Sequence, residues 1–109
     1  MKKVLLLLAV SVLVVNVYAQ KNKIKIETNY GNIIVMLYDN TPLNTNNMVK
    51  LAKEHFYDST LFHRCIPQFV IQGGDPDSKR AEAGKALGMG ELSYKVPAEI
   101  NDVNFHKRG

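Results

Sequence analysis

The apolar residues of this chain are concentrated at its start, and this uneven distribution limits what the remainder can fold into. Fifteen of the first 19 residues are apolar. The other 90 residues hold roughly 35 apolar ones, about 39%, which is an ordinary fraction for a soluble domain. A chain of this length forms one domain at most. The remainder is therefore expected to be a single small domain with a modest core.

Basic residues are scattered along the chain. It carries 14 Lys and Arg against 10 Asp and Glu, and no basic run is longer than two residues. Nucleic acids and anionic membrane surfaces are bound by clustered basic side chains. We therefore expect no nucleic acid among the partners of this protein.

Residues 1–19 have the layout of a secretory signal peptide. Two lysines form a basic start, an apolar run follows, and Ala19 precedes the expected cleavage site. Cleavage there leaves residues 20–109 as one exported domain, periplasmic or secreted. The alternative is an uncleaved membrane anchor, but about 20 apolar residues are needed to span a bilayer and Asn16 interrupts this run. No stable membrane span is expected after cleavage.

The thiol and imidazole groups do not indicate a disulfide or a metal site. Cys65 is the only cysteine, so an internal disulfide cannot form. The three histidines, His55, His63 and His106, are widely spaced and have no second cysteine near them. No metal ion or cofactor is expected. Cys65 is instead predicted to be a small buried hydrophobe.

Alternation and apolar runs predict a β-hairpin followed by a helix. Residues 23–28 alternate basic and apolar side chains, residues 29–32 form a turn, and residues 33–38 are an apolar run of strand length. The apolar stripe of residues 42–54 is typical of a helix packed on a sheet. The hydroxyl of Thr41 is expected to cap the first free N–H groups of this helix.

Two shorter strands are predicted at residues 61–66 and 69–72, and residues 77–109 are loop-rich. Arg64 and Gln72 stand within these apolar strands. Either the fold satisfies both side chains internally, or they point into an open groove. Internal satisfaction is the favoured interpretation, because buried polar groups normally have partners. Periodicity alone indicates a small α+β or barrel-like domain.

Residues 62–76 read FHRCIPQFVIQGGDP. This run resembles the signature of the cyclophilin-type peptidyl-prolyl cis-trans isomerases, and the similarity extends over residues 26–76. The resemblance implies a mostly β fold with α: a cyclophilin-like antiparallel β-barrel of eight strands, closed by two helices. Together with the signal peptide, it implies a bacterial, exported rotamase that assists the folding of proline-containing polypeptides.

The resemblance also implies residue roles. Arg64 matches the catalytic residue, and Phe69, Val70 and Gln72 match residues that line the pocket for the substrate proline. No covalent intermediate, proton transfer or cofactor is required. A fixed guanidinium can donate more strongly to a twisted X–Pro amide than to a planar one, which lowers the barrier to rotation. Alternation places His63 on the opposite face from Arg64, so His63 is expected to be a satisfied core residue.

Three positions depart from the family pattern, and a fourth, Phe69, depends on the turn before it. Cys65 replaces a branched aliphatic residue, and Gln68 replaces a glycine. His55 stands where a helix-ending glycine is common, which raises the cost of a left-handed cap. Alternation also places Phe69 on the opposite face from Val70 and Gln72. If Phe69 lines the same substrate groove, the turn at residues 67–68 must rotate it toward that groove.

By comparison with the family, the chain stops in mid-domain at Gly109. Only the N-terminal half of the barrel would be present, and its open strand edges predict a marginal, aggregation-prone fragment. Residues 20–109 alone are expected to bind a hydrophobic dye, to protect their amides weakly and to give no isomerase rate above background. The alternatives are a domain that binds proline-containing peptides without turnover, and an inert fragment.

Overall fold

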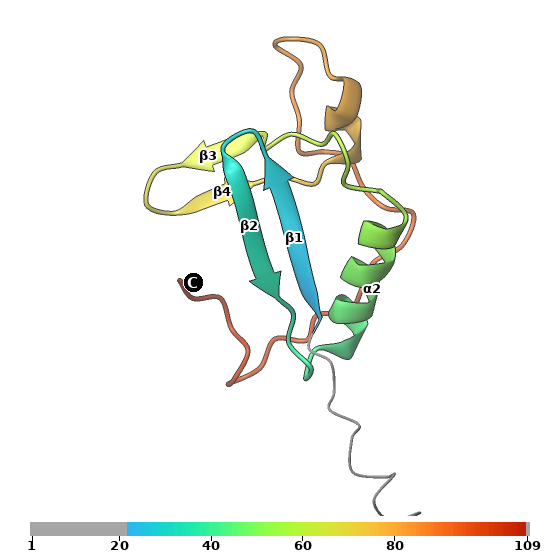
Figure 1. Cartoon of the computed structure of the whole chain (residues 1–109), viewed down its shortest axis with the longest axis vertical. Helices are drawn as coiled ribbons and strands as arrows, with labels where there is room; N and C mark the ends of the chain where they lie inside the picture. Colours follow the sequence, from blue (N-terminus) through green and yellow to red (C-terminus); the bar gives the residue numbers. More distant parts are fainter. Residues whose placement is uncertain (1–21, 109) are drawn as a thin grey trace, which may run out of the picture.

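The computed structural model describes residues 22–108. The predicted signal peptide lies outside the described residues. The elements follow in the order β1 (Lys23–Thr28), β2 (Gly31–Met36), α2 (Pro42–Lys53), β3 (Arg64–Ile66), β4 (Val70–Gln72) and the 3-10 helix η1 (Pro76–Arg80). Figure 1 shows the β1–β2 hairpin at the centre, α2 beside β1, and the β3–β4 hairpin running across the tip of the first.

The first hairpin forms as predicted, with one apolar face. Ile24 pairs with Val35, and Ile26 pairs with Ile33. Cross-strand partners point to the same side of a sheet, so these four branched aliphatic side chains share a face. The opposite face carries charged residues of β1. The alternation of basic and apolar residues in β1 therefore separates the two faces of the sheet.

The turn of this hairpin is tighter than predicted. The Thr28 hydroxyl donates to the carbonyl of Gly31 at 2.7 Å and accepts from the N–H of Tyr30 at 3.1 Å. These bonds close the turn, and the ladder begins at the Thr28–Gly31 pair. Strand β2 therefore spans Gly31–Met36 instead of residues 33–38.

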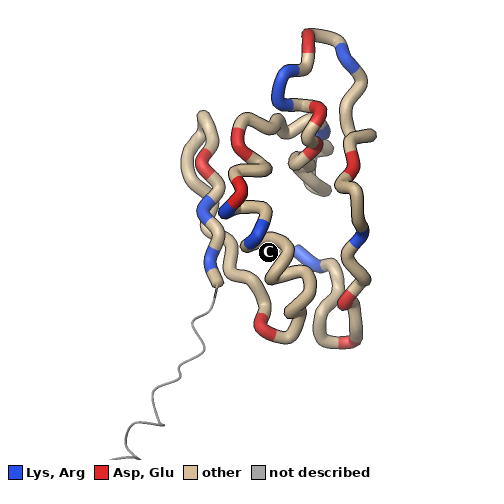
Figure 2. Tube along the Cα trace, turned by 90° about the vertical axis from the view of Figure 1, so that its right-hand side faces the viewer, with Lys and Arg blue, Asp and Glu red and all other residues tan. Residues whose placement is uncertain are grey.

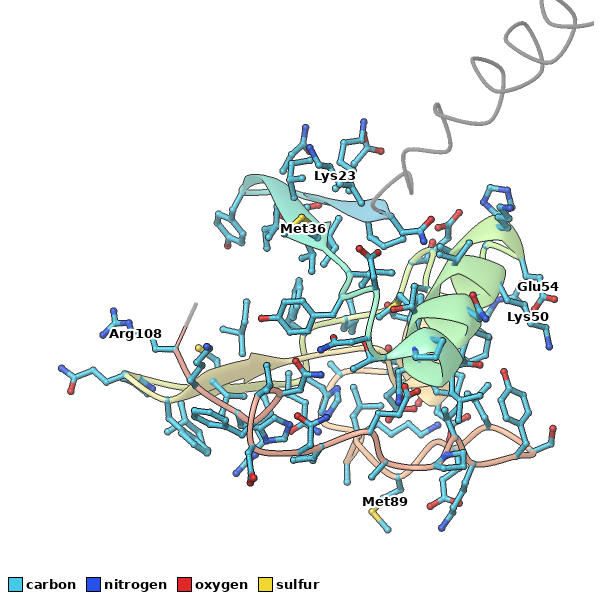
Figure 3. All side chains as sticks on the ribbon, turned by 90° about the horizontal axis from the view of Figure 1, so that it is seen from below. Lys23, Met36, Lys50, Glu54, Met89 and Arg108 are labelled. Atoms are coloured by element: carbon cyan, nitrogen blue, oxygen red, sulfur yellow. The ribbon has the colours of Figure 1, made fainter. Side chains whose placement is uncertain are left out.

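The two hairpins are separate antiparallel sheets. Within residues 22–108, neither strand of the first hairpin pairs with a strand of the second. Figure 3 shows the hairpins in different layers, with Met89 projecting away from both. The predicted mixture of β and α is confirmed, whereas the described strands do not close a barrel, because each sheet has only two strands.

Helix α2 begins at Pro42 as predicted, but Thr41 does not cap it. No side-chain capping bond is made at this position. The Thr41 hydroxyl instead donates backwards to the carbonyl of Tyr38 at 3.2 Å. Thr45 donates to the same carbonyl at 2.8 Å. The predicted cap is therefore wrong because the preceding loop takes the hydroxyl of Thr41.

The C-terminal end of α2 is closed by a left-handed residue, His55, whose φ is 57°. The N–H of Phe56 donates to the carbonyl of Leu51 at 3.0 Å. The N–H of His55 donates to the carbonyl of Ala52 at 3.2 Å. These are the two bonds of a Schellman motif. The His55 imidazole also bonds the carboxylate of Asp58 at 2.9 Å, which helps to hold a conformation that glycine would adopt without strain.

The interior of the described chain is mainly polar. Leu51, at 2% exposure, is the only buried hydrophobic side chain in residues 22–108. The other buried residues are Thr45, Asp75 and Ser78. Cys65 is exposed, so its predicted burial is wrong. Its neighbours in β3 are exposed too, because no further layer from the described part of the chain covers this short hairpin.

The part of the chain after η1 contains no strand or α-helix within residues 81–108, as predicted for a loop-rich segment. It passes along α2 and then below the first hairpin (Figure 1). Basic and acidic residues are interspersed along the trace in Figure 2. Among the residues that the structure describes, we find no helix with the length and apolar character of a membrane span.

Candidate functional site

The second hairpin brings three of the four predicted site residues onto one face. Arg64 is the direct partner of Gln72, and Ile66 is the partner of Val70. These four side chains share a face, because partners and alternate residues of a strand point to the same side. The Arg64 guanidinium donates from Nη1 to the Gln72 side-chain oxygen at 3.3 Å. We refer to Arg64, Ile66, Val70 and Gln72 as the Arg64 face.

The Arg64 face is open. Arg64 and Gln72 are both exposed, so the interpretation that the fold satisfies them internally is wrong. Within the described residues, Arg64 makes no ion pair. A guanidinium has five N–H donors, and the bond to Gln72 uses only one of them. The other guanidinium donors therefore remain available to a ligand on this face.

The tight turn between the strands explains the position of Phe69. The N–H of Phe69 donates to the carbonyl of Ile66 at 3.1 Å across Pro67 and Gln68. Gln68 has a φ of 61°, as the second central residue of a type II turn requires. Phe69 therefore belongs to the turn, and 75% of it is exposed. It is an uncovered aromatic side chain in the turn that precedes Val70.

Two buried polar residues, Asp75 and Ser78, fix the chain on both sides of the hairpin, and we call them the polar hub. The N–H of Leu61, before β3, donates to the Ser78 hydroxyl at 2.9 Å. That hydroxyl donates to the carbonyl of Asp75 at 2.6 Å. The Asp75 carboxylate accepts from the N–H groups of Asp77 and Gly88. The hub therefore ties the start of β3, the end of β4 and the loop around Gly88 together.

The carboxylate of Asp75 is strongly engaged. Hydrogen bonds, first of all from the Gly88 N–H, lower the pKa of Asp75 from its ordinary value, although burial opposes this shift. Gly90 allows the close approach, because a Cβ at Gly90 would overlap the Asp75 carboxylate. Sequence reasoning missed this role. The signal is Asp75 followed by Pro76, which is a typical start of a helical turn.

His63 packs against the loop that contacts the polar hub. Its Nε2 lies 3.1 Å from the position that a Cβ of Gly88 would occupy. The side chain is half-buried, and its Nδ1 is buried without a hydrogen-bond partner among the described residues. The expectation of a satisfied core histidine is therefore wrong. Within residues 22–108, no group of His, Cys, Asp and Glu is suited to hold a metal ion.

Comparison with known proteins identifies the family. The family described as "Cyclophilin type peptidyl-prolyl cis-trans isomerase/CLD" matches residues 23–109. The chain therefore belongs to the cyclophilin-type peptidyl-prolyl cis-trans isomerases. This agrees with the resemblance seen in residues 62–76.

Individual relatives share the same domain. A peptidyl-prolyl cis-trans isomerase of Synechococcus elongatus is 44% identical over 77% of this chain and 52% of its own. One of Acinetobacter baylyi is 38% identical over 68% of this chain and 40% of its own. The spliceosome-associated protein CWC27 homolog of Danio rerio is 41% identical over 86% of this chain and 20% of its own. The chain thus spans about half or less of these relatives. No solved structure matches it significantly.

Proposed function

We propose that this protein is a peptidyl-prolyl cis-trans isomerase that assists the folding of exported, proline-containing polypeptides. The observation that carries the proposal is the exposed Arg64 guanidinium, paired across the second hairpin with Gln72 at 3.3 Å. Family membership and the relatives named as isomerases support it.

The chemistry requires only a positioned donor. An X–Pro amide resists rotation because its C–N bond has partial double-bond character, with a barrier of about 18–20 kcal/mol. Twisting the bond makes the imide nitrogen pyramidal and basic. Arg64 would donate to this twisted group more strongly than to the planar one, which lowers the barrier. Gln72 would orient the substrate backbone, while Val70 and Phe69 would contact the pyrrolidine ring.

A second candidate function is binding of proline-containing peptides without turnover. The exposure of Arg64 favours it, because water screens the field of a guanidinium and weakens its effect on a developing charge. An inert fragment is the third interpretation. The rate of proline isomerisation separates the catalytic interpretation from the other two.

The proposal is tested with two proteins in a protease-coupled isomerisation assay. One is residues 20–109. The other is a chimera, in which this chain replaces the matching part of the Synechococcus elongatus relative. We expect no rate above background for residues 20–109, because Arg64 lies in an open site in the described structure. We expect catalysis by the chimera, because the relative supplies the part of its domain that this chain does not match. A folded chimera without activity would contradict the proposal and favour peptide binding or an inert chain.

Export is proposed from the leader alone. We expect protein recovered from the periplasm or the medium to begin at Gln20, because signal peptidase cleaves after small residues such as Ala19. N-terminal sequencing of the recovered protein measures this directly. A soluble cytoplasmic protein that retains Met1 would refute export.

A further inference from the structure

The N-terminus of α2 receives no cap from its own segment. Thr41 makes no capping bond, and the first turn contains no acidic residue. The first N–H groups of a helix have no partner within the helix, and together with the helix dipole they attract a negative charge. This end of α2 therefore depends on an acceptor from elsewhere in the chain.

Glu99 provides that acceptor from 55 residues away. Its Oε1 accepts from the N–H of Leu43 at 3.0 Å. Its Oε2 accepts from the N–H of Asn44 at 2.9 Å and from the side-chain amide of Asn44 at 2.7 Å. The same amide donates to the carbonyl of Pro97 at 3.2 Å. One carboxylate thus makes three bonds that cap the helix and hold the later segment against it.

A second contact holds the same segment one turn further along α2. The hydroxyl of Tyr94 donates to the side-chain oxygen of Asn47 at 2.5 Å. The ammonium of Lys50 lies 5.3 Å from the centre of the Tyr94 ring, within the range of a cation–π interaction. We call residues 94–99 the clamp, because they contact the first two turns of α2 side by side.

We propose that Glu99 is a pH-sensitive latch, which tightens the clamp on α2 when ionised and loosens it when protonated. The carboxylate bonds are charge-assisted, and such bonds are about twice as strong as neutral ones. Protonation removes the charge that faces the helix dipole and leaves one oxygen as an O–H donor. The bond between Tyr94 and Asn47 and the bond from the Asn44 amide to the Pro97 carbonyl do not involve this charge, and they remain as polar attachments of the clamp.

The sign of the pH dependence follows from the same bonds. Burial raises the pKa of Glu99, but the hydrogen bonds from Asn44 and Leu43 outweigh it and hold the pKa below the ordinary value of 4.5. A lowered pKa means that the latch contributes fully above pH 4.5. Its contribution is lost as the pH falls through the lower value of the folded state.

The titration of Glu99 must be distinguished from that of other titratable groups in the molecule. Tyr38 and His106 line the same hollow of about 380 Å³ as Glu99. Lys50 faces the clamp from α2 through Tyr94. Asp75 is a further acid-sensitive carboxylate, but it belongs to the polar hub. A substitution at Glu99 distinguishes its titration from that of all these groups.

The experiment is an NMR titration of the protein as isolated, from pH 7 to pH 3. We expect the amide signals of Leu43 and Asn44 to shift together with the side-chain carboxyl signal of Glu99, at a midpoint below 4.5. Hydrogen-exchange protection of these two amides should fall about five- to tenfold over the same range, as expected for the loss of a cap. Amide signals that stay constant while the Glu99 carboxyl titrates would overturn the proposal.

Two variants show whether the transition belongs to Glu99. Glu99→Gln keeps the shape of the side chain without its charge, so it should show the low protection at every pH and lack the transition. Glu91→Gln removes the same charge from an exposed position and should titrate like the unsubstituted protein. A transition that persists in Glu99→Gln would assign it to another group, such as Asp75, and refute the latch. If that variant fails to fold, the titration of the unsubstituted protein still decides.

Discussion

Replacing Arg64 with alanine is expected to lower kcat/KM of the chimera about 100- to 1,000-fold. Removal of one preorganised donor to a transition state typically costs about 2.7–4 kcal/mol. Arg64→Lys should also be poor, because an ammonium cannot reproduce the planar fork of a guanidinium. The rate is measured with a short proline-containing peptide in the protease-coupled assay.

The matched control is Arg80→Ala. Arg80 is an exposed residue at the end of η1, so this substitution removes the same charge without touching the Arg64 face. It should leave the rate unchanged. A normal rate for Arg64→Ala, combined with an unchanged melting temperature, would remove Arg64 from the mechanism. Equal losses in both variants would instead indicate a general effect of charge on substrate binding.

Leu51→Ala is expected to be the most destabilising substitution in α2. Truncating a buried leucine typically costs about 2–5 kcal/mol. A typical domain has a free energy of unfolding of only about 5–15 kcal/mol. Leu51 is the only hydrophobic side chain that is buried in residues 22–108, so no other apolar contact of that kind can compensate. Thermal unfolding followed by circular dichroism should show a large fall in the melting temperature or the loss of the transition.

Leu43→Ala is the control for this substitution. Leu43 lies in the same helix but is 51% exposed, and surface changes are usually within about 0.5 kcal/mol. Its backbone N–H, which bonds Glu99, is unaffected by the change of side chain. Similar melting temperatures for the two variants would show that Leu51 does not anchor α2.

Local patterns predicted the regular elements well. The alternation in β1, the apolar run of β2 and the stripe of α2 each depend on neighbouring residues, and each element formed at about the expected place. The register of β3 and β4 placed Arg64 opposite Gln72, as two strands joined by a tight turn require. These features are encoded within short segments of the chain.

The predictions that the structure contradicts depend on partners that are distant in sequence, or on covering layers that the described residues do not supply. Thr41 has the residue type of a cap, but Glu99 takes that role from 55 residues away. No local pattern reports such a bond. Cys65 was expected inside because a free cysteine behaves as a small hydrophobe, yet burial depends on a covering layer that the described residues do not supply. The role of Asp75 in the polar hub was not predicted either, because one of its hydrogen-bond donors, Gly88, lies in a later loop.

The roles of Phe69, Val70 and Gln72 remain predictions. The structure places Val70 and Gln72 on the Arg64 face and Phe69 in the adjoining turn. The left-handed conformation of Gln68 shows how the turn is made without the glycine expected there. Alanine substitutions at these positions can be compared in the assay described for Arg64.

A polar interior also determines how the molecule responds to temperature. The heat-capacity change of unfolding arises mainly from apolar surface that becomes exposed to water. Leu51 is the one fully buried hydrophobic side chain in residues 22–108, and the other apolar side chains there are half-buried or exposed, so unfolding of this part exposes less new apolar surface than unfolding of a domain with a closed core. Its free energy of unfolding therefore varies with temperature along a shallow curve. Cooling weakens hydrophobic contacts, but the bonds of Asp75, Ser78 and Glu99 are polar and do not depend on that effect.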